Sequence, residues 1–401
     1  MPAFRGVLFR PSSPQARRPI LGTAGVATKA RDHRLDLFRG LALLFIFVDH
    51  IPGNPLGWIT IRNYGFSDAT EIFVFISGYA AARAYGTSAA DDFLFTSARI
   101  LRRCWQLYLA HIFLFVIFAT HVASVTSNLN NPLFAEEMNV TSFLHDPETT
   151  LLQVLLLRFR PVNMDVLPLY IVLLLAFPLV LPALKRWPWL VLGLSVALWQ
   201  YTRTFDINLR TYPGDGVWFF DPSGWQILFV LGAVFALKPV LTAAVLARSR
   251  YLDVAAALYL VFAFYIVLGW KFPVLAQLVP GTLERWMYPI DKTALDPLRL
   301  IHFLCIAYVT IRLFKPDTAV PSYRLVRPVV ACGRHSLEVF CLGTILSLVA
   351  HIVIGQTGGR LGTHLAVAMT GIVVLAGTAA VLDWYKRREQ DRVKGRGGAS
   401  A

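Results

Sequence analysis

Long apolar runs, repeated along the chain, constrain this sequence more than any other feature. A helix needs about 20 mostly apolar residues to cross a bilayer, and ten stretches come close to that length. Of the 401 residues, 56% are hydrophobic and only 15% are charged, a balance typical of integral membrane proteins. The chain is therefore expected to be all-α and polytopic, with about ten transmembrane helices. The expected spans are 35–52, 66–86, 100–123, 165–183, 188–203, 224–246, 252–270, 298–314, 334–354 and 362–385.

Basic residues orient these spans. Most of the 38 Lys and Arg residues fall in segments that share one side of the membrane, and the positive-inside rule makes that side, with both termini, cytosolic. The same rule explains the net charge of +14 without a nucleic-acid partner. We expect a disordered basic arm at 1–34, a membrane-embedded domain at 35–385 and a basic cytosolic tail at 386–401. The apolar stretch 149–159 is too short to cross and is expected to lie along the outer interface.

The four cysteines indicate neither a disulfide nor a metal site. They show no CxxC pattern and no zinc-type spacing with histidine, and none falls in a segment expected on the oxidising side. They are Cys104, Cys305, Cys332 and Cys341.

The first span carries an arginine and a histidine on one face. The eleven steps from Arg39 to His50 amount to three helical turns and 20°, which places the side chains roughly 16 Å apart along the axis. Arg39 would lie near the cytosolic boundary and His50 near the outer one. The spacing alone favours a snorkelling arginine and an interfacial histidine, and a functional pair is the alternative. His302 and His335, in later spans, are expected to be structural.

Carboxylates on the second span make the functional interpretation stronger. Asp68 and Glu71 lie three residues apart on its outer half, and intramembrane carboxylates are costly and rarely incidental. One of them beside His50 would fix the tautomer of the imidazole for acid–base chemistry, although a structural bridge also fits. Asp49 joins these catalytic candidates, but its side chain diverges from that of its neighbour His50.

Two further sets of residues are typical of ligand binding. Arg99, Arg102 and Arg103 adjoin the second inner loop, close in topology to Arg39, and guanidinium groups grip phosphate in a bidentate manner. Attraction to lipid head groups is the alternative. The expected outer segments mix carboxylates with aromatic rings, as sugar-binding surfaces do, although an interfacial aromatic belt has the same composition. The candidates for binding an acceptor are Asp165, Asp215, Trp218 and Asp221.

Six stretches, in order along the chain, resemble the OpgC family of membrane succinyltransferases that modify osmoregulated periplasmic glucans. They cover roughly residues 31–385 and include "RLDLFRGLALLFIFVDH", "SDATEIFVFISGYAAARAYG", "RPVNMDVLPLYIVLLLAFPLVLP", "GWQILFVLGAVFA", "LDPLRLIHFLCIAYV" and "GRHSLEVFCLGT". This family is similar in turn to the type 3 acyltransferase superfamily, in which a basic residue precedes a histidine by ten intervening residues. Arg39 and His50 fit that spacing, and Arg99 with Arg103 fits the superfamily's arginine motif.

The resemblance implies transfer of an acyl group, succinyl by the family's name, from cytosolic acyl-CoA to a hydroxyl of a periplasmic glucan. It implies a site in the bacterial inner membrane, with His50 catalytic, arginines contacting the succinyl-CoA donor and no bound cofactor. His50 would act as a general base or as a nucleophile. The alternatives are an acetyltransferase for another envelope polysaccharide and a secondary transporter of an anionic solute. The oligomeric state is not predicted.

Overall fold

The computed structural model describes residues 32–86, 92–238, 249–314 and 326–397, together with residues 240, 243, 244 and 247. The described residues are helical apart from loops and one isolated bridge between Arg210 and Val217. This confirms the all-α fold class. The predicted N-terminal arm lies almost wholly outside the described residues. The helices all belong to one compact unit, His33–Ala401.

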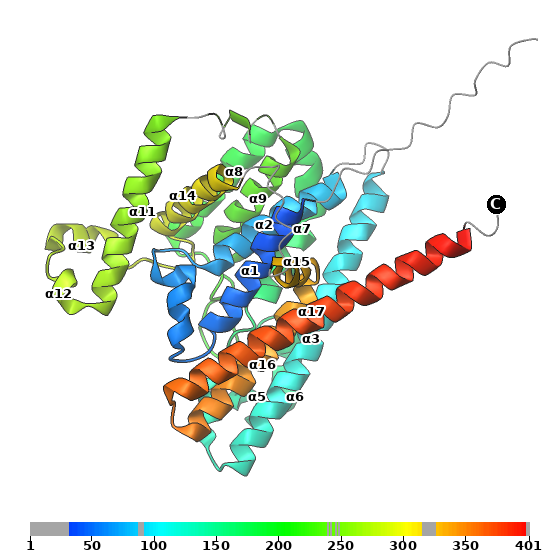
Figure 1. Ribbon diagram of the computed structural model, residues 1–401, viewed down its shortest axis with the longest axis vertical. Coiled ribbons are helices and arrows are strands. Elements are labelled where there is room, and N and C mark those ends of the chain that lie inside the picture. Colours follow the sequence, from blue (N-terminus) through cyan, green and yellow to red (C-terminus); the bar gives the residue numbers. More distant parts are fainter. Residues whose placement is uncertain are drawn as a thin grey trace, which may run out of the picture. The chain divides into compact units, whose positions relative to one another are not determined.

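Each of the ten predicted spans overlaps a helix in the structure (Figure 1). These are α1 (His33–Asp49), α2 (Ala69–Gly86), α3 (Phe93–Asn128), α7 (Val166–Arg186), α8 (Pro188–Phe205), α9 (Pro222–Leu237), α11 (Arg250–Lys271), α14 (Pro297–Leu313), α16 (Ser336–Thr357) and α17 (Leu361–Gly397). The shorter elements are η1 (Pro55–Ile59), η2 (Ile61–Asn63), α4 (Pro132–Glu137), α5 (Thr141–His145), α6 (Pro147–Leu155), α12 (Pro273–Ala276), α13 (Gly281–Met287) and α15 (Val326–Arg334). The predicted interfacial stretch 149–159 overlaps α6, and the predicted tail begins inside α17.

Five helices are long and apolar enough to cross a membrane: α3, α7, α11, α16 and α17. The shorter helix α9 is also strongly apolar. The chain is therefore a multi-pass membrane protein. By contrast, α1 and α14 have 17 residues each, slightly less than a full crossing needs. The total of ten spans and the cytosolic position of both termini stay predictions.

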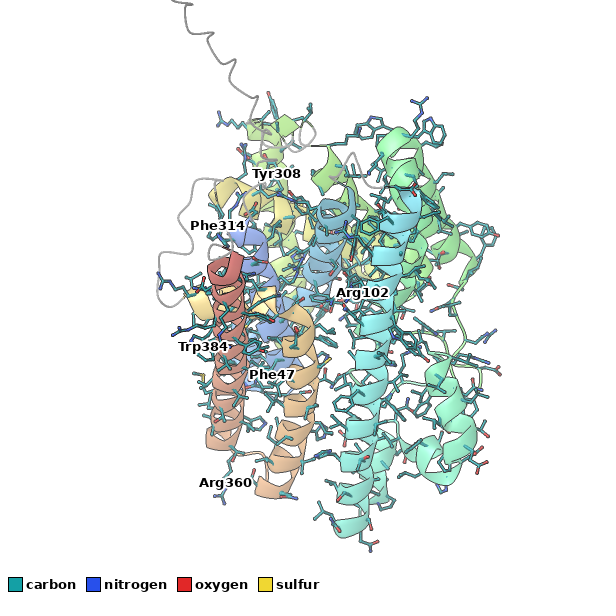
Figure 2. The ribbon with its side chains drawn as sticks, turned by 90° about the vertical axis from the view of Figure 1, so that its right-hand side faces the viewer. Phe47, Arg102, Tyr308, Phe314, Arg360 and Trp384 are labelled. Carbon is teal, nitrogen blue, oxygen red and sulfur yellow. The ribbon has the colours of Figure 1, made fainter. Side chains whose placement is uncertain are left out.

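Contacts between α1, α2 and α14 define two opposite ends of the helix bundle. At one end, the Arg34 guanidinium at the start of α1 donates to the Phe314 carbonyl just after α14, over 3.0 Å. At the other end, Asp68 just before α2 accepts a hydrogen bond of 3.1 Å from Arg299 near the start of α14. We name these the Arg34 end and the Asp68 end. In Figure 2, Phe314 and Arg360 lie toward opposite ends.

Glycines bring α2 and α9 into backbone contact. A Cβ atom on Gly78 would lie 2.0 Å from the Phe229 carbonyl oxygen, and one on Gly232 would lie 2.1 Å from the Phe75 carbonyl oxygen. Small residues at a helix crossing allow such close approach inside a membrane. The two glycines therefore fix α2, which carries Asp68 and Glu71 at its start, against α9.

The same device holds α1 against α15. A Cβ atom on Gly40 would lie 1.9 Å from the Val329 carbonyl oxygen, and one on Gly333 would lie 1.7 Å from the Asp36 carbonyl oxygen. Gly40 directly follows Arg39, so this contact sets the position of the arginine within the helix packing. Both helices that carry the predicted catalytic residues are thus placed by glycine crossings.

We predict that Gly232→Ala destabilises the protein by about 1–3 kcal/mol, because the added methyl group must force α2 and α9 apart. The matched control is Gly193→Ala on α8, where a Cβ atom would meet no atom within 4 Å. This control is expected to be neutral or slightly stabilising, since alanine favours helix more than glycine does. Thermal unfolding in detergent measures both, and equal midpoints for the two variants would contradict the crossing argument.

Candidate functional site

The start of α2 places two carboxylates side by side. Asp68 precedes the helix, and its Oδ1 atom accepts a 2.8 Å hydrogen bond from the Thr70 N–H. Glu71 reaches back, so that its Oε2 atom accepts a 2.9 Å bond from the Asp68 N–H. This reciprocal arrangement is a capping box, which satisfies backbone donors at a helix start. The positive end of the helix dipole also favours negative charge here.

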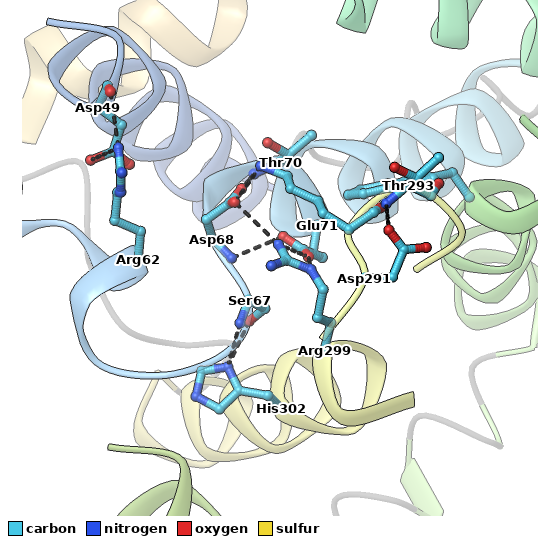
Figure 3. A network of polar contacts seen from close by, with 12 residues as sticks. Asp49, Arg62, Ser67, Asp68, Thr70, Glu71, Asp291, Thr293, Arg299 and His302 are labelled. Atoms are coloured by element: carbon cyan, nitrogen blue, oxygen red, sulfur yellow. Dashed lines mark hydrogen bonds and ion pairs between the residues drawn. The ribbon is translucent and has the colours of Figure 1, made fainter. Parts of the chain in front are cut away.

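Two cations balance these carboxylates: Lys292, which precedes α14, and Arg299 in the first turn of α14, which Figure 3 shows between Asp68 and Glu71. The Arg299 guanidinium donates to Glu71 Oε1 over 2.9 Å from Nε and 2.6 Å from Nη2, and Nη2 also reaches Asp68 Oδ2 at 3.1 Å. Lys292 Nζ lies 2.5 Å from the same Asp68 oxygen. The Glu71 side chain is fully buried, so its charge requires such a partner. We call these four residues the Asp68 cluster.

His50 lies beside this cluster, immediately after α1. Asp68 and Lys292 both act electrostatically on its imidazole. Among the residues that the structure describes, however, no hydrogen bond joins the imidazole to Asp68 or Glu71. The expected direct carboxylate–imidazole pair is therefore not formed, because both carboxylates are engaged by Arg299 and Lys292. The catalytic roles of His50, Asp68 and Glu71 stay predictions.

Asp49 is directed toward the loop that follows α1. Its Oδ1 atom accepts a 2.7 Å bond from the Thr60 hydroxyl, and Arg62 Nη1 donates to its backbone carbonyl over 3.0 Å. Figure 3 shows the Asp49–Arg62 contact apart from the Asp68 cluster. Asp49 thus has its own partners, which agrees with the expectation that it does not orient His50.

His302, one turn after Arg299 on α14, anchors the residue before Asp68. Its Nδ1 atom accepts from the Ser67 N–H at 3.2 Å and lies 2.7 Å from the Ser67 hydroxyl oxygen. Both side chains are buried. This contact supports the structural role expected for His302, and with Arg299 it fixes the start of α2 to α14.

The predicted donor-binding arginines fall into two groups. Arg39 reaches α2, where its Nη2 atom donates to the Ile76 carbonyl over 3.3 Å. Arg103 on α3 is half-buried, and its Nη1 atom donates to Gln106 Oε1 over 3.2 Å. By contrast, Arg102 is exposed on α3 (Figure 2). Arg99 is also exposed, and its Nη2 atom donates to the Ala84 carbonyl near the end of α2.

A narrow apolar crevice separates α2 from α7 along the middle of α2. Its free space is too narrow to hold water. On α2 it begins just after Glu71 and extends to Ser77, next to the Ile76 carbonyl that Arg39 contacts. The crevice therefore lies between the Asp68 cluster and the Arg39 contact. It is lined by Phe73, Val74, Ser77, Val166, Tyr170 and Leu173.

Arg160 joins two of the predicted acceptor-binding residues. Its Nε atom donates to Asp165 Oδ1 over 2.9 Å, and its guanidinium lies 4.1 Å from the centroid of the Trp218 ring. Burial raises the pKa of Asp165, with the charge of Arg160 opposing that effect. The Trp218 side chain is only 4% exposed. This tryptophan consequently presents no open face on which a sugar could stack in this structure.

The other two acceptor candidates differ in exposure. Asp221 caps α9, where its Oδ1 atom accepts from the Ser223 N–H at 3.0 Å and from the Ser223 hydroxyl at 2.7 Å. It is buried, and these bonds assign it a structural role here. Asp215 is exposed in the loop between α8 and α9. Contact of either residue with an acceptor stays a prediction.

Three cations at this end were not predicted from the sequence: Arg160, Lys292 and Arg299. An arginine inside an apolar span is itself a signal of an internal counter-charge, and Arg299 stands in the expected span 298–314. Lys292 and Arg160 precede α14 and α7, in loops where a cation is unremarkable in sequence. Their partners could be identified only from the fold.

A family model described as OpgC protein matches residues 31–387, which is most of the chain. The extent agrees closely with the resemblance noted in the six sequence motifs. Searches among curated proteins and among solved structures returned no match.

We predict that Arg299→Met destabilises the protein by about 3–5 kcal/mol, because it leaves the Glu71 carboxylate buried without compensation. Adding Glu71→Gln should recover part of that loss. The control is Arg62→Met, whose 4.0 Å ion pair with Asp49 involves a half-exposed arginine and should contribute less than about 1 kcal/mol. Unfolding midpoints in detergent test this, and similar losses for Arg299→Met and Arg62→Met would refute the assignment of a buried pair.

Proposed function

This chain belongs to the OpgC family, and from that premise we propose that it is a membrane O-succinyltransferase acting on a periplasmic glucan. Membership indicates acyltransferase activity in general. The proposal adds that the donor is cytosolic succinyl-CoA, that the acceptor is a glucan hydroxyl on the opposite side, and that the membrane is the bacterial inner membrane. It places the Arg34 end in the cytosol.

The observation that carries this proposal is the separation of two polar sites along the same helices. Arg39 donates to the Ile76 carbonyl in the middle of α2, whereas His50 follows α1 at the end of the helices where Asp68 meets Arg299 and Lys292. A reaction between a cytosolic donor and an external acceptor needs a cationic group that binds the donor and a base that acts on the acceptor hydroxyl. These two groups must lie at different depths in the membrane. The two sites supply them on a shared set of helices.

The donor would bind through its phosphates at the arginines. Guanidinium groups make charge-assisted, bidentate bonds to phosphate, and Arg39, Arg99, Arg102 and Arg103 all stand toward the Arg34 end. The pantetheine arm would then pass between α2 and α7 and bring the thioester toward His50. Because the crevice there is too narrow even for water, the two helices must separate when the donor binds.

His50 would serve as the base at the outer site. As a glucan hydroxyl attacks the thioester carbonyl carbon, a C–O bond forms and the hydroxyl proton passes to the imidazole. When the C–S bond breaks, the CoA thiolate leaves and takes that proton. Asp68, which acts electrostatically on His50, would steady the imidazolium formed between these steps. An acyl-imidazole route, with His50 as nucleophile, uses the same residues.

We predict that His50→Ala lowers the rate of glucan acylation by at least about 100-fold, because general acid–base catalysis contributes that much or more. His121→Ala, at an exposed histidine of α3, is the matched control and should keep full activity. Mass spectrometry of periplasmic glucans from strains with each variant measures the outcome. Succinyl adducts that persist with His50→Ala would remove the catalytic assignment. Acetyl adducts would favour the acetyltransferase alternative, and solute flux without any adduct would favour a transporter.

A second prediction concerns the donor. Arg39→Gln should raise the KM for acyl-CoA by about 10- to 100-fold, since a charge-assisted hydrogen bond contributes about 1.5–3 kcal/mol. Arg285→Gln, at an exposed arginine of α13, is the control and should leave that KM unchanged. Steady-state kinetics with purified protein measures both values. An unchanged KM for Arg39→Gln would exclude Arg39 from donor binding.

A further inference from the structure

The segment between α13 and α14 holds the backbone of Lys292 rigidly. The Asp291 carboxylate accepts hydrogen bonds from the N–H groups of Thr293 and Ala294, over 2.9 and 2.8 Å. The Trp225 indole N–H donates to the Lys292 carbonyl oxygen over 3.0 Å. Figure 3 shows the Asp291–Thr293 contact close to the Asp68 cluster. None of these bonds uses the Lys292 side chain. The position of the Lys292 backbone therefore does not depend on the contacts of its ammonium group.

Lys292 is the accessible cation of the Asp68 cluster. Its side chain is 27% exposed, whereas that of Arg299 is 10% exposed. An ammonium group has three N–H donors, and within the described part of the chain the Lys292 ammonium has one hydrogen-bond acceptor, Asp68. It also faces the rings of Phe219 and Phe220, at 5.7 and 5.4 Å from their centroids. Two of its donors are therefore available to a ligand.

The ammonium group lies at the end of the helices where the proposed base and the proposed acceptor residues occur. Its partner Asp68 directly precedes α2, and His50 directly follows α1. The Phe219 and Phe220 rings that it faces lie between Trp218 and Asp221 in the chain. Two other cations near the cluster have acceptors of their own. Arg299 donates to both carboxylates of the cluster, and Arg160 donates to Asp165 and to the Leu157 carbonyl.

We propose that Lys292 is the oxyanion donor for acyl transfer in this protein. The inference rests on the proposed function. When the glucan hydroxyl adds to the thioester carbonyl carbon, the π electrons of the carbonyl move to its oxygen, and the proton moves to His50. The Lys292 ammonium donates a hydrogen bond to that oxyanion. When the carbonyl re-forms, the C–S bond breaks, and the leaving thiolate recovers the proton from His50. Lys292 keeps its own protons throughout, as a preorganised electrostatic donor.

The test compares Lys292→Met with Lys271→Met, a control at an exposed lysine at the end of α11. Loss of one oxyanion donor lowers kcat by about 100- to 1,000-fold. We expect this loss for Lys292→Met with the KM for succinyl-CoA and the unfolding midpoint nearly unchanged, and partial rescue by Lys292→Arg. A raised KM with kcat intact would instead mean that Lys292 binds the free carboxylate of the acyl group, and would overturn the inference.

A double variant separates catalysis from charge balance. If Lys292 merely neutralises Asp68, then Lys292→Met together with Asp68→Asn should be no slower than Asp68→Asn alone. If it stabilises the oxyanion, the double variant should be slower than Asp68→Asn by the same 100- to 1,000-fold factor. Wild-type kcat in Lys292→Met would overturn this inference alone. Absence of any acylated glucan with the wild-type protein would overturn the proposed function and this inference with it.

Discussion

The buried ion pair between Arg299 and Glu71 is the interaction on which the rest of the site depends. A fully buried carboxylate must find a cation at short range, and Arg299 supplies it over 2.6 and 2.9 Å. The pair ties the start of α2 to the start of α14. Because of that tie, Asp68 and Lys292 meet in a direct ion pair at the end of the helices where His50 follows α1. Without this pair, the Glu71 carboxylate of the capping box would be buried among the packed helices with no Arg299 to balance its charge.

Close helix crossings at glycines fix the positions of the helices on either side of this ion pair. Gly78 and Gly232 bring α2 onto α9, while Gly40 and Gly333 bring α1 onto α15, in each case with backbone against backbone. The start of α9 is next to the segment that presents Lys292, since Trp225 holds its carbonyl. The crossings therefore fix the helix that precedes His50 and the helix that follows Asp68, and α7 faces α2 across the narrow crevice. Donor passage would need movement between α2 and α7, and the crossings allow it because they involve other helix pairs.

Local features of the fold were predictable from sequence, and distant pairings were not. Apolar run length predicted the position of a helix at each of the ten expected spans, because hydropathy is a property of the local sequence; five of these helices are long and apolar enough to cross a membrane. The spacing from Arg39 to His50 was likewise a property of one helix. The partner of Glu71 was hidden, because Arg299 lies 228 residues later in the chain. The capping role of Asp221 is readable from its position before Pro222 and Ser223, whereas the burial of Trp218 under Arg160 depends on tertiary packing.

The central claim is that a donor on one side of the membrane reacts with an acceptor on the other. The most direct test uses purified protein in sealed lipid vesicles, with acyl-CoA enclosed and glucan outside, or with both outside. Protein reconstituted in both orientations includes molecules that can react in the first arrangement, and neither orientation can react in the second. The account predicts acylated glucan only when donor and acceptor are separated by the bilayer. Equal product with both substrates outside sealed vesicles would contradict it.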